Sequence, residues 1–235
     1  MPGTLVQSLT GTAANTTNPP STAFSIATTT GNRLIVGLMT DASGVANYTT
    51  SISGGGVTTF TRDASVGQVV GSNLDISMDI WSGPITAGAT TALTFGFSPT
   101  SATRLVWLIQ EWSGLAGFDK ASALATGTST AALSGTSGTL AQADSVAFGL
   151  VEWRTGTSTP SAGATYSTPS LITNGSATTS AVFGAMEAKQ VAATTAVTAD
   201  FGLGTSRKWG CLVAVYSAAA TYTGRPRPQV PMLRM

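Results

Sequence analysis

The chain has 235 residues, a net charge of +1 and only 9% charged residues, against about 25% in an average soluble protein. This composition excludes the clustered Lys and Arg of a general nucleic-acid-binding surface, and the apolar runs are too short to span a bilayer. With 42% hydrophobic residues the chain can bury a core, so its surface polarity must come from Thr, Ser, Asn and Gly. Such a weakly charged surface suits a protein that works within an assembly.

The first half of the chain predicts β-strands throughout. The N-terminus has neither a basic region nor a long apolar run, so we expect no secretory signal. Short runs of Val, Ile, Thr, Phe and Trp alternate with Gly, Ser, Asn and Pro, and helical periodicity is absent. This spacing is typical of a β-sandwich or jelly roll. The expected strands lie near residues 4–12, 22–29, 33–40, 57–62, 74–82, 90–97 and 103–113.

Two features of this half bear on chemistry. The run Ser53-Gly54-Gly55-Gly56 precedes a strand rather than a helix, so it predicts a hairpin loop and not a phosphate-binding loop. Along residues 73–81, Leu74, Ile76, Met78 and Ile80 alternate with polar residues. Asp75 and Asp79 on the polar side are separated by roughly 13 Å of strand, too far for a catalytic carboxylate pair. A solvated polar face is therefore expected.

The second half predicts another series of strands, near 138–152, 164–168, 179–188, 193–201 and 206–217. Continuous apolar runs at 105–109 and 212–216 predict strands that are central or covered on both faces. Cys211 adjoins the second run and is expected to be a small buried core residue. As the only cysteine, it excludes a disulfide within the chain.

An internal duplication is the most informative feature. Residues 89–97 match residues 193–201 at an offset of 104, and the same offset continues without a gap, placing Leu108 on Leu212. An even offset keeps each side chain on its face of the strand. Gapped matches relate 33–38 to 145–150 and 58–61 to 164–167. We therefore expect two tandem jelly-roll-like β-sandwich units, residues 1–116 and 117–218, packed together because their linker is short.

The order of these motifs resembles a family of duplicated jelly-roll-like modules in tailed-phage virion proteins and bacterial surface proteins. The resemblance covers about residues 22–218, although the second copy has Val215-Tyr216-Ser217-Ala218 where the first has the Glu-Trp-Ser-Gly step. It implies a structural, decorating or adhesive module. The segments that carry it are Asn32–Gly37, Val57–Arg62, Ile80–Pro84, Ala87–Thr91, Gln110–Leu115 and Asp119.

Residues needed for common catalytic sites are missing. The chain has no His, which excludes a Ser-His-Asp triad and a His-ligated zinc site, and no calcium-loop pattern is found. Glu111 and Glu152 lie in or beside apolar strands, where pairing with an arginine such as Arg104 or Arg154 is expected. We predict no catalysis, no cofactor and no metal.

The aromatic residues Trp81, Trp112 and Trp153 lie at strand ends, where they could stack on sugars or pack in a core or interface. Several functions therefore stay open. The first is a non-enzymatic virion protein assembled in the host cytoplasm, a homo-oligomeric capsid decoration or cement subunit whose partners are the major capsid or tail proteins of the particle. The others are a minor tail or fibre protein that binds host glycans, and a secreted carbohydrate-binding module. No nucleic-acid or membrane partner is expected.

Residues 219–235 follow the second repeat and predict an extended arm, because the prolines exclude helix and interrupt a sheet ladder. The segment is basic and also carries apolar side chains, which a solvated tail would not need. We expect either a frayed terminus or an arm lying along a neighbouring subunit. The residues of the expected arm are Arg225, Pro226, Arg227, Pro228, Val230, Met232, Leu233 and Arg234.

Overall fold

The computed structural model describes residues 3–17, 21–23, 27–41, 48–66, 76–88, 90–98, 101–154, 158–167, 170–174 and 182–220. Within these ranges the chain is all-β and contains no helix, as the sequence predicts. The strands are β1 (Thr4–Thr17), β2 (Ser21–Ala23), β3 (Arg33–Asp41), β4 (Tyr48–Gly54), β5 (Thr61–Val66), β6 (Ile76–Pro84), β7 (Ala92–Ser98), β8 (Ser101–Ser113), β9 (Leu115–Ala121), β10 (Ala125–Leu133), β11 (Ser145–Arg154), β12 (Ser170–Asn174), β13 (Val182–Val191) and β14 (Asp200–Ala218).

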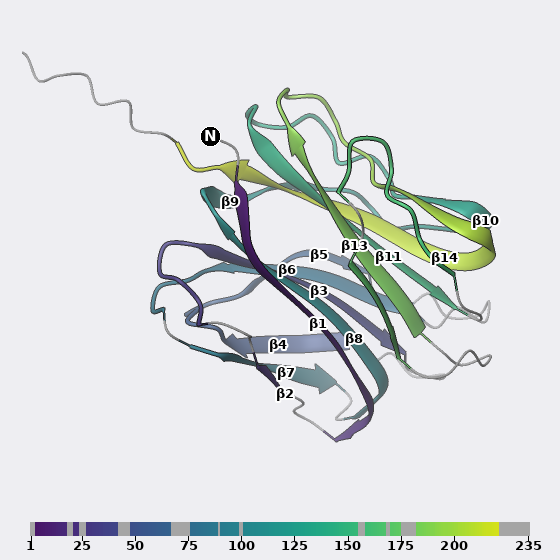
Figure 1. Cartoon of the computed structure of the whole chain (residues 1–235), viewed down its shortest axis with the longest axis horizontal. Coiled ribbons are helices and arrows are strands. Elements are labelled where there is room, and N and C mark those ends of the chain that lie inside the picture. Colours follow the sequence, from purple (N-terminus) through teal and green to yellow (C-terminus); the bar gives the residue numbers. More distant parts are fainter. Residues whose placement is uncertain are drawn as a thin grey trace, which may run out of the picture.

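The strands form three sheets stacked in layers (Figure 1). Sheet A is the middle layer, with the order β1-β8-β3-β6-β5, and sheet B covers one of its faces with the order β2-β7-β4. Sheet C covers the other face with the order β10-β14-β11-β13-β12, and β9 also pairs with β14. The strands of sheet A come from residues 4–113 and those of sheet C from residues 115–218, so each sheet is built from one half of the chain.

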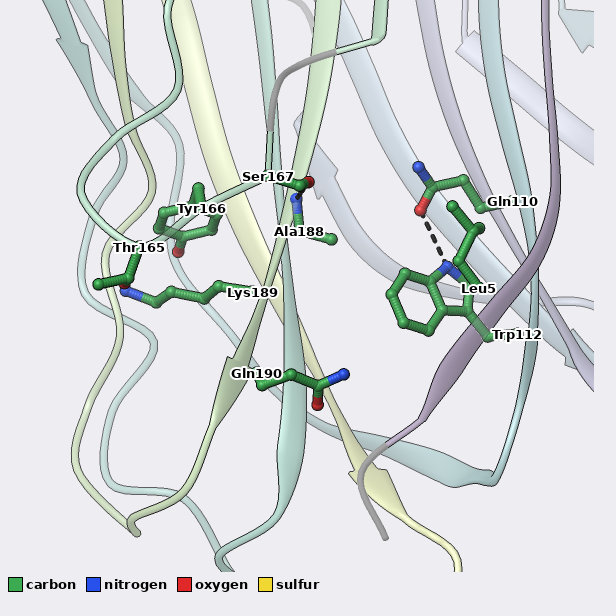
Figure 2. A pocket seen from close by; sticks show the side chains of 9 residues that line it. All are labelled: Leu5, Gln110, Trp112, Thr165, Tyr166, Ser167, Ala188, Lys189 and Gln190. Atoms are coloured by element: carbon green, nitrogen blue, oxygen red, sulfur yellow. Dashed lines mark hydrogen bonds between the residues drawn. The ribbon is translucent and has the colours of Figure 1, made fainter.

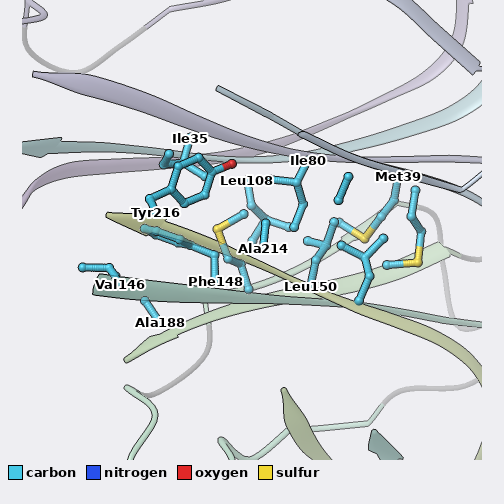
Figure 3. Packing of buried hydrophobic residues seen from close by; sticks show 14 of the residues in the cluster. Ile35, Met39, Ile80, Leu108, Val146, Phe148, Leu150, Ala188, Ala214 and Tyr216 are labelled. Atoms are coloured by element: carbon cyan, nitrogen blue, oxygen red, sulfur yellow. The ribbon is translucent and has the colours of Figure 1, made fainter. Parts of the chain in front are cut away.

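The core between sheets A and C joins the two halves of the molecule. Figure 3 shows Ile35 and Leu108 of sheet A facing Phe148, Leu150 and other apolar side chains of sheet C. A second core lies between sheets A and B, and a third on the far face of sheet C. Because both faces of sheets A and C are covered, β8 and β14 are buried along most of their apolar runs, as the sequence predicts.

Cys211 lies in the core on the far face of sheet C and is fully buried, which confirms its expected role as a core residue. Burial in this apolar setting raises the pKa of its thiol well above the ordinary value.

The solvated face expected along 73–81 is wrong for the part that the structure describes. Met78 and Ile80 do point into the core between sheets A and C, but Ser77 and Asp79 on the opposite side are also buried. Sheet B covers that side of β6, a layer that strand alternation alone does not reveal. Burial raises the pKa of Asp79 to about 6, although Arg62 lies 3.7 Å away. Asp75 lies outside the described residues.

Several strands lie elsewhere than the sequence predicts. The segment 193–199 is irregular, and its backbone pairs with the 134–140 segment through Ser134 and Ser137. Strand β5 begins at Thr61, where the pattern predicts a strand over 57–62. Strands β4, β9, β10 and β12 were not expected, whereas the described part of the expected strand over 164–168 is irregular. In β10, Thr, Ser, Gly and Ala give little apolar contrast.

The glycine-rich run ends β4 and carries the chain from sheet B towards sheet A. Gly54, Gly55 and Gly56 all have positive φ, a backbone conformation open to glycine at little cost. Gly54 and Val57 form an isolated antiparallel bridge, so the run makes a tight loop, although β4 and β5 then enter different sheets. The expected C-terminal arm lies outside the described residues from 221 onward.

Candidate functional site

A cleft of about 430 Å³ lies at one edge of the contact between sheets A and C. One wall comes from the end of β8 and the start of β1, and the other from β13 and the loop that precedes β12. The described residues that line it are Leu5, Gln110, Trp112, Thr165, Tyr166, Ser167, Ala188, Lys189 and Gln190 (Figure 2).

The walls of the cleft are held by hydrogen bonds and ring contacts. The Trp112 indole donates to Gln110 Oε1 at 2.9 Å and meets the ring of Phe148 edge-on, at 5.2 Å between centroids. On the opposite wall the Tyr166 hydroxyl donates to the carbonyl of Thr198 at 3.0 Å. Figure 2 shows Ala188 between the two aromatic walls. Its small side chain leaves the space that the cleft occupies.

The loop wall is attached to β13 by backbone and side-chain bonds. Ser167 N donates to the Ala188 carbonyl at 2.8 Å, and Ala188 N donates to Ser167 Oγ at 3.2 Å. Lys189 Nζ lies 4.3 Å from the centroid of the Tyr166 ring, a cation–π contact. Partial burial lowers the pKa of the Lys189 amine, and burial raises the pKa of the Tyr166 hydroxyl.

Glu187 lies two residues before Lys189 on the same strand and is fully buried. Its carboxylate accepts hydrogen bonds from Gly163 N at 3.0 Å and from Asp200 N at 3.2 Å. Burial nevertheless raises the pKa of Glu187 to about 7, because desolvation outweighs these two donors. The carboxyl therefore fastens the 163 loop to β13 and β14.

Glu111 is also fully buried and is held without an arginine. Gln7 Nε2 donates to one carboxylate oxygen at 2.5 Å, while Thr29 N and Asn32 Nδ2 donate to the other at 3.0 and 2.6 Å. Pairing with Arg104 was expected, but the amide and backbone donors take that place. The carboxylate thus joins β1, β8 and the turn before β3.

Glu152 follows the expected pattern, because Arg154 Nε lies 3.8 Å from its carboxylate and both residues are buried. A further hydrogen bond joins sheets A and C: the Tyr216 hydroxyl of β14 donates to Asp63 Oδ2 of β5 at 2.7 Å. Burial raises the pKa of Asp63, and Arg33 acts in the opposite direction. These carboxylates hold elements of the fold together.

The three tryptophans singled out in the sequence are all buried. Trp81 packs between sheets A and B with Arg62 over its ring, and Trp153 stacks on Phe183 in the core on the far face of sheet C. Trp112 alone borders the cleft, and it is only 7% exposed. Core packing is therefore the role that the structure supports for Trp81 and Trp153.

Sequence reasoning missed the cleft because its lining comes from four segments far apart in the chain. One signal was present: Gln110 interrupts the apolar run of β8, and Lys189 with Gln190 interrupts that of β13. Polar side chains that break an otherwise buried strand often face an opening. Leu5, on the first strand, gives no such signal, since an apolar residue in a strand is ordinary.

Within the described ranges, no group of three or more Cys, Asp or Glu side chains is placed to hold a metal ion. The same residues include no helix with the length and apolarity needed to cross a bilayer. No protein-family model, curated protein or solved structure matches this chain. The family resemblance drawn from the sequence motifs therefore stays a prediction.

Proposed function

We propose that this chain is a non-enzymatic structural protein of a tailed-phage virion. Its role would be that of a capsid decoration or cement subunit, assembled in the host cytoplasm, which associates with copies of itself and with the major capsid protein. The phage context derives from the motif resemblance. The role in an assembly is supported by the surface of the molecule.

The observation that carries the proposal is the character of two edge strands. β1 and β10 are terminal strands of sheets A and C, and neither contains a charged residue or a proline. Leu5 is 44% exposed on β1, and Leu133 is 47% exposed on β10. Proteins that stay monomeric usually protect such edges with charge, proline or a cover. An uncharged, partly apolar edge favours pairing with another chain.

The use of the buried acids also supports a structural role. Glu111, Glu152, Glu187 and Asp63 each contact a donor or a cation within the fold. Among the described residues that line the cleft, Lys189 and Tyr166 are the titratable ones and none is a carboxylate. An arrangement of this kind lacks the acid and base pair that hydrolysis of glycosides requires.

We infer further that a tandem duplication underlies the two halves. The orders β1-β8-β3-β6-β5 and β10-β14-β11-β13-β12 can be matched position by position, and the offset of 104 places β8 on β14. Leu108 and Leu212, matched by that offset, both lie in the core between sheets A and C. In the first half the pairs β1–β8, β2–β7 and β3–β6 are nested, as in an antiparallel ribbon rolled into a jelly roll.

One of the sequence matches needs a different offset. Aligning Arg33–Leu38 with Ser145–Leu150 places Leu34 on Val146. Leu34 lies in the core between sheets A and B, whereas Val146 lies in the core between sheets A and C. The match of 33–38 with 145–150 corresponds to an offset of 112. Because side chains alternate along a strand, an even offset should keep each residue on the same face, so this segment requires an odd offset instead.

Localisation on particles tests the virion proposal. An antibody raised against the full chain is applied to purified virions from the source, and the grids are viewed by electron microscopy. Labelling of the capsid surface is the expected result. Labelling of the tail would instead support the alternative, a minor tail or fibre protein that binds host glycans, which the amide and hydroxyl groups of the cleft favour. Absence of label from intact and opened particles would refute a virion role.

Self-association provides a second test, independent of any particle. Thr126 and Thr130 are exposed on β10, and we expect the double change Thr126→Lys and Thr130→Lys to weaken association of the chain by about tenfold or more, because like charges would meet at the edge. The matched control carries Thr59→Lys and Thr195→Lys, at exposed threonines off the edge strands. Sedimentation velocity over a concentration series gives the association constant. A wild-type chain that stays monomeric, or equal weakening by both pairs, would count against the edge.

A further inference from the structure

The cleft lies at the end of the molecule from which the C-terminal segment leaves. Ser217, Ser145 and Val191 are in register across β14, β11 and β13, so Ser217 lies two strand spacings, roughly 10 Å, from Val191. Gln190, the neighbour of Val191, lines the cleft. The described chain ends three residues after Ser217, at Ala220.

The start of β1 closes the same end of the molecule. Gln190 Nε2 donates to the carbonyl of Gly3 at 2.7 Å, and Ala219 N donates to the carbonyl of Gly114 at 2.7 Å. Gly114 follows β8 directly, two residues after Trp112 of the cleft wall. The exit point of the C-terminal segment therefore lies beside the β8 wall of the cleft.

The length of the segment fits this separation. Residues 221–225 would span roughly 15 Å as an extended chain at about 3.1 Å per residue. That length exceeds the roughly 10 Å between Ser217 and Val191, so an extended segment could bring Pro226 to the cleft. Residues 226–233 would then be available to enter it.

The chemistry of the cleft matches the apolar part of the segment. The lining includes two aromatic residues, Trp112 and Tyr166, on the two sides of β13, and Leu5 adds an exposed apolar side chain at the rim. Grooves lined by aromatic residues are a common receptor for proline-rich segments in polyproline geometry, which lose little entropy on binding. The described lining carries no acidic residue, so the prolines and apolar side chains, rather than the arginines, would be held.

We propose that the cleft is the docking site for residues 226–233 of its own chain. The short tether gives an effective concentration of about 1 mM, so that an intrinsic dissociation constant near 100 µM would keep the cleft about 90% occupied. This places the C-terminal segment on its own subunit, in contrast to an arm bound to a neighbour. The proposal does not depend on whether the protein belongs to a virion.

The test uses the full chain and a dye-labelled peptide with the sequence of residues 221–235. In a tail variant, Pro226, Pro228, Pro231 and Leu233 are changed to Ser, which leaves the length and charge of the chain unaltered. Fluorescence anisotropy of the peptide, with the protein titrated up to about 1 mM, measures binding. We expect the peptide to bind the tail variant at least about tenfold more tightly than the wild type, whose own segment competes for the cleft.

Two further changes in the tail variant locate the binding site. Leu5→Ser should weaken peptide binding about fivefold, because an apolar contact at the rim is lost. Leu133→Ser is the matched control, an equally exposed leucine on β10 that is not part of the cleft lining, and should leave binding within about twofold. A peptide in which the arginines are replaced by Gln should still bind, because the arginines are not held.

Several outcomes would overturn the proposal. If the peptide binds neither protein, the cleft is not its receptor. If it binds wild type and tail variant equally, the cleft is empty in the subunit and the segment is free to reach a neighbouring copy. Equal effects of Leu5→Ser and Leu133→Ser would place the peptide elsewhere. Glycan binding by the wild type that is lost on Leu5→Ser would assign the cleft to a sugar.

Discussion

The free energy of unfolding should fall by roughly 5–6 kcal/mol as the pH rises from 4 to 8, which is opposite to ordinary acid denaturation. The cause is the pair of buried carboxyls Asp79 and Glu187. Burial raises the pKa of Asp79 to about 6 and that of Glu187 to about 7, from ordinary values of 3.8 and 4.5. The folded chain therefore holds these two protons more tightly than the unfolded chain does.

The direction of the effect follows from linkage. A carboxyl whose pKa is raised by folding contributes its full stability below the unfolded pKa, and that contribution is lost as the pH rises through the folded pKa. The loss should begin near pH 4 and be complete slightly above pH 7. Each carboxyl accounts for roughly 3 kcal/mol, since one unit of pKa corresponds to about 1.4 kcal/mol.

Urea denaturation followed by tryptophan fluorescence, repeated at unit pH intervals from 4 to 8, measures this dependence. The chain with Asp79→Asn and Glu187→Gln is the control, and its stability should vary much less over the same range. A wild-type stability that is flat or rises with pH would show that the two carboxyls are not desolvated as their burial indicates.

The alternation along 73–81 shows which part of the fold a local sequence pattern can predict. It correctly predicts that Met78 and Ile80 point into a core, because side chains on a strand alternate between its two faces. It wrongly predicts that Asp79 is exposed to solvent, because the sequence of the strand itself does not show that sheet B packs over β6. The number of layers is set by contacts between distant segments, and a local pattern does not contain that information.

The strands that were missed illustrate a second limit. β10 consists of Ala, Thr, Gly, Ser and one Leu, so it lacks the contrast of apolar and polar residues from which strands are recognised. It forms because the backbone of β14 offers an edge to pair with. The segment 193–199 shows the opposite case, because its composition predicts a strand that does not form. Its backbone N–H groups at 197 and 199 donate to the side-chain hydroxyls of Ser137 and Ser134 instead.

The cleft depends on the same long-range contacts. Trp112 and Glu111 could be singled out from the sequence, because an aromatic and an acid near the end of an apolar strand are unusual. That Trp112 and Tyr166 line one cleft follows from the packing of sheet A on sheet C, which no spacing in the chain encodes. Glu111 and Glu187 join different elements of the fold because their hydrogen-bond donors differ: Glu111 accepts from Thr29 N, and Glu187 accepts from Gly163 N. These donors also lie in turns that are distant in the chain.

Replacement of Gly56 by Ala should destabilise the fold by roughly 3–4 kcal/mol. Gly56 has a φ of 73°, and a Cβ built on it would lie 1.8 Å from the carbonyl oxygen of Ala87. That oxygen belongs to the backbone, so relief requires the 85–87 segment to move. The Gly56 carbonyl accepts hydrogen bonds from Thr86 N at 2.9 Å and Ala87 N at 3.1 Å, and such a movement would break them.

Gly138→Ala is the matched control, because Gly138 also has a positive φ of 82°, but no atom lies within 4 Å of the position that an added methyl group would take. Its cost should be only that of the left-handed backbone, about 1–2 kcal/mol. Thermal unfolding of both variants separates the two contributions, with a decrease in Tm of about 10 °C expected for Gly56→Ala and about a third of that for Gly138→Ala. Equal decreases would mean that the 85–87 segment yields freely, and that the loop does not lock β4 against the end of β6.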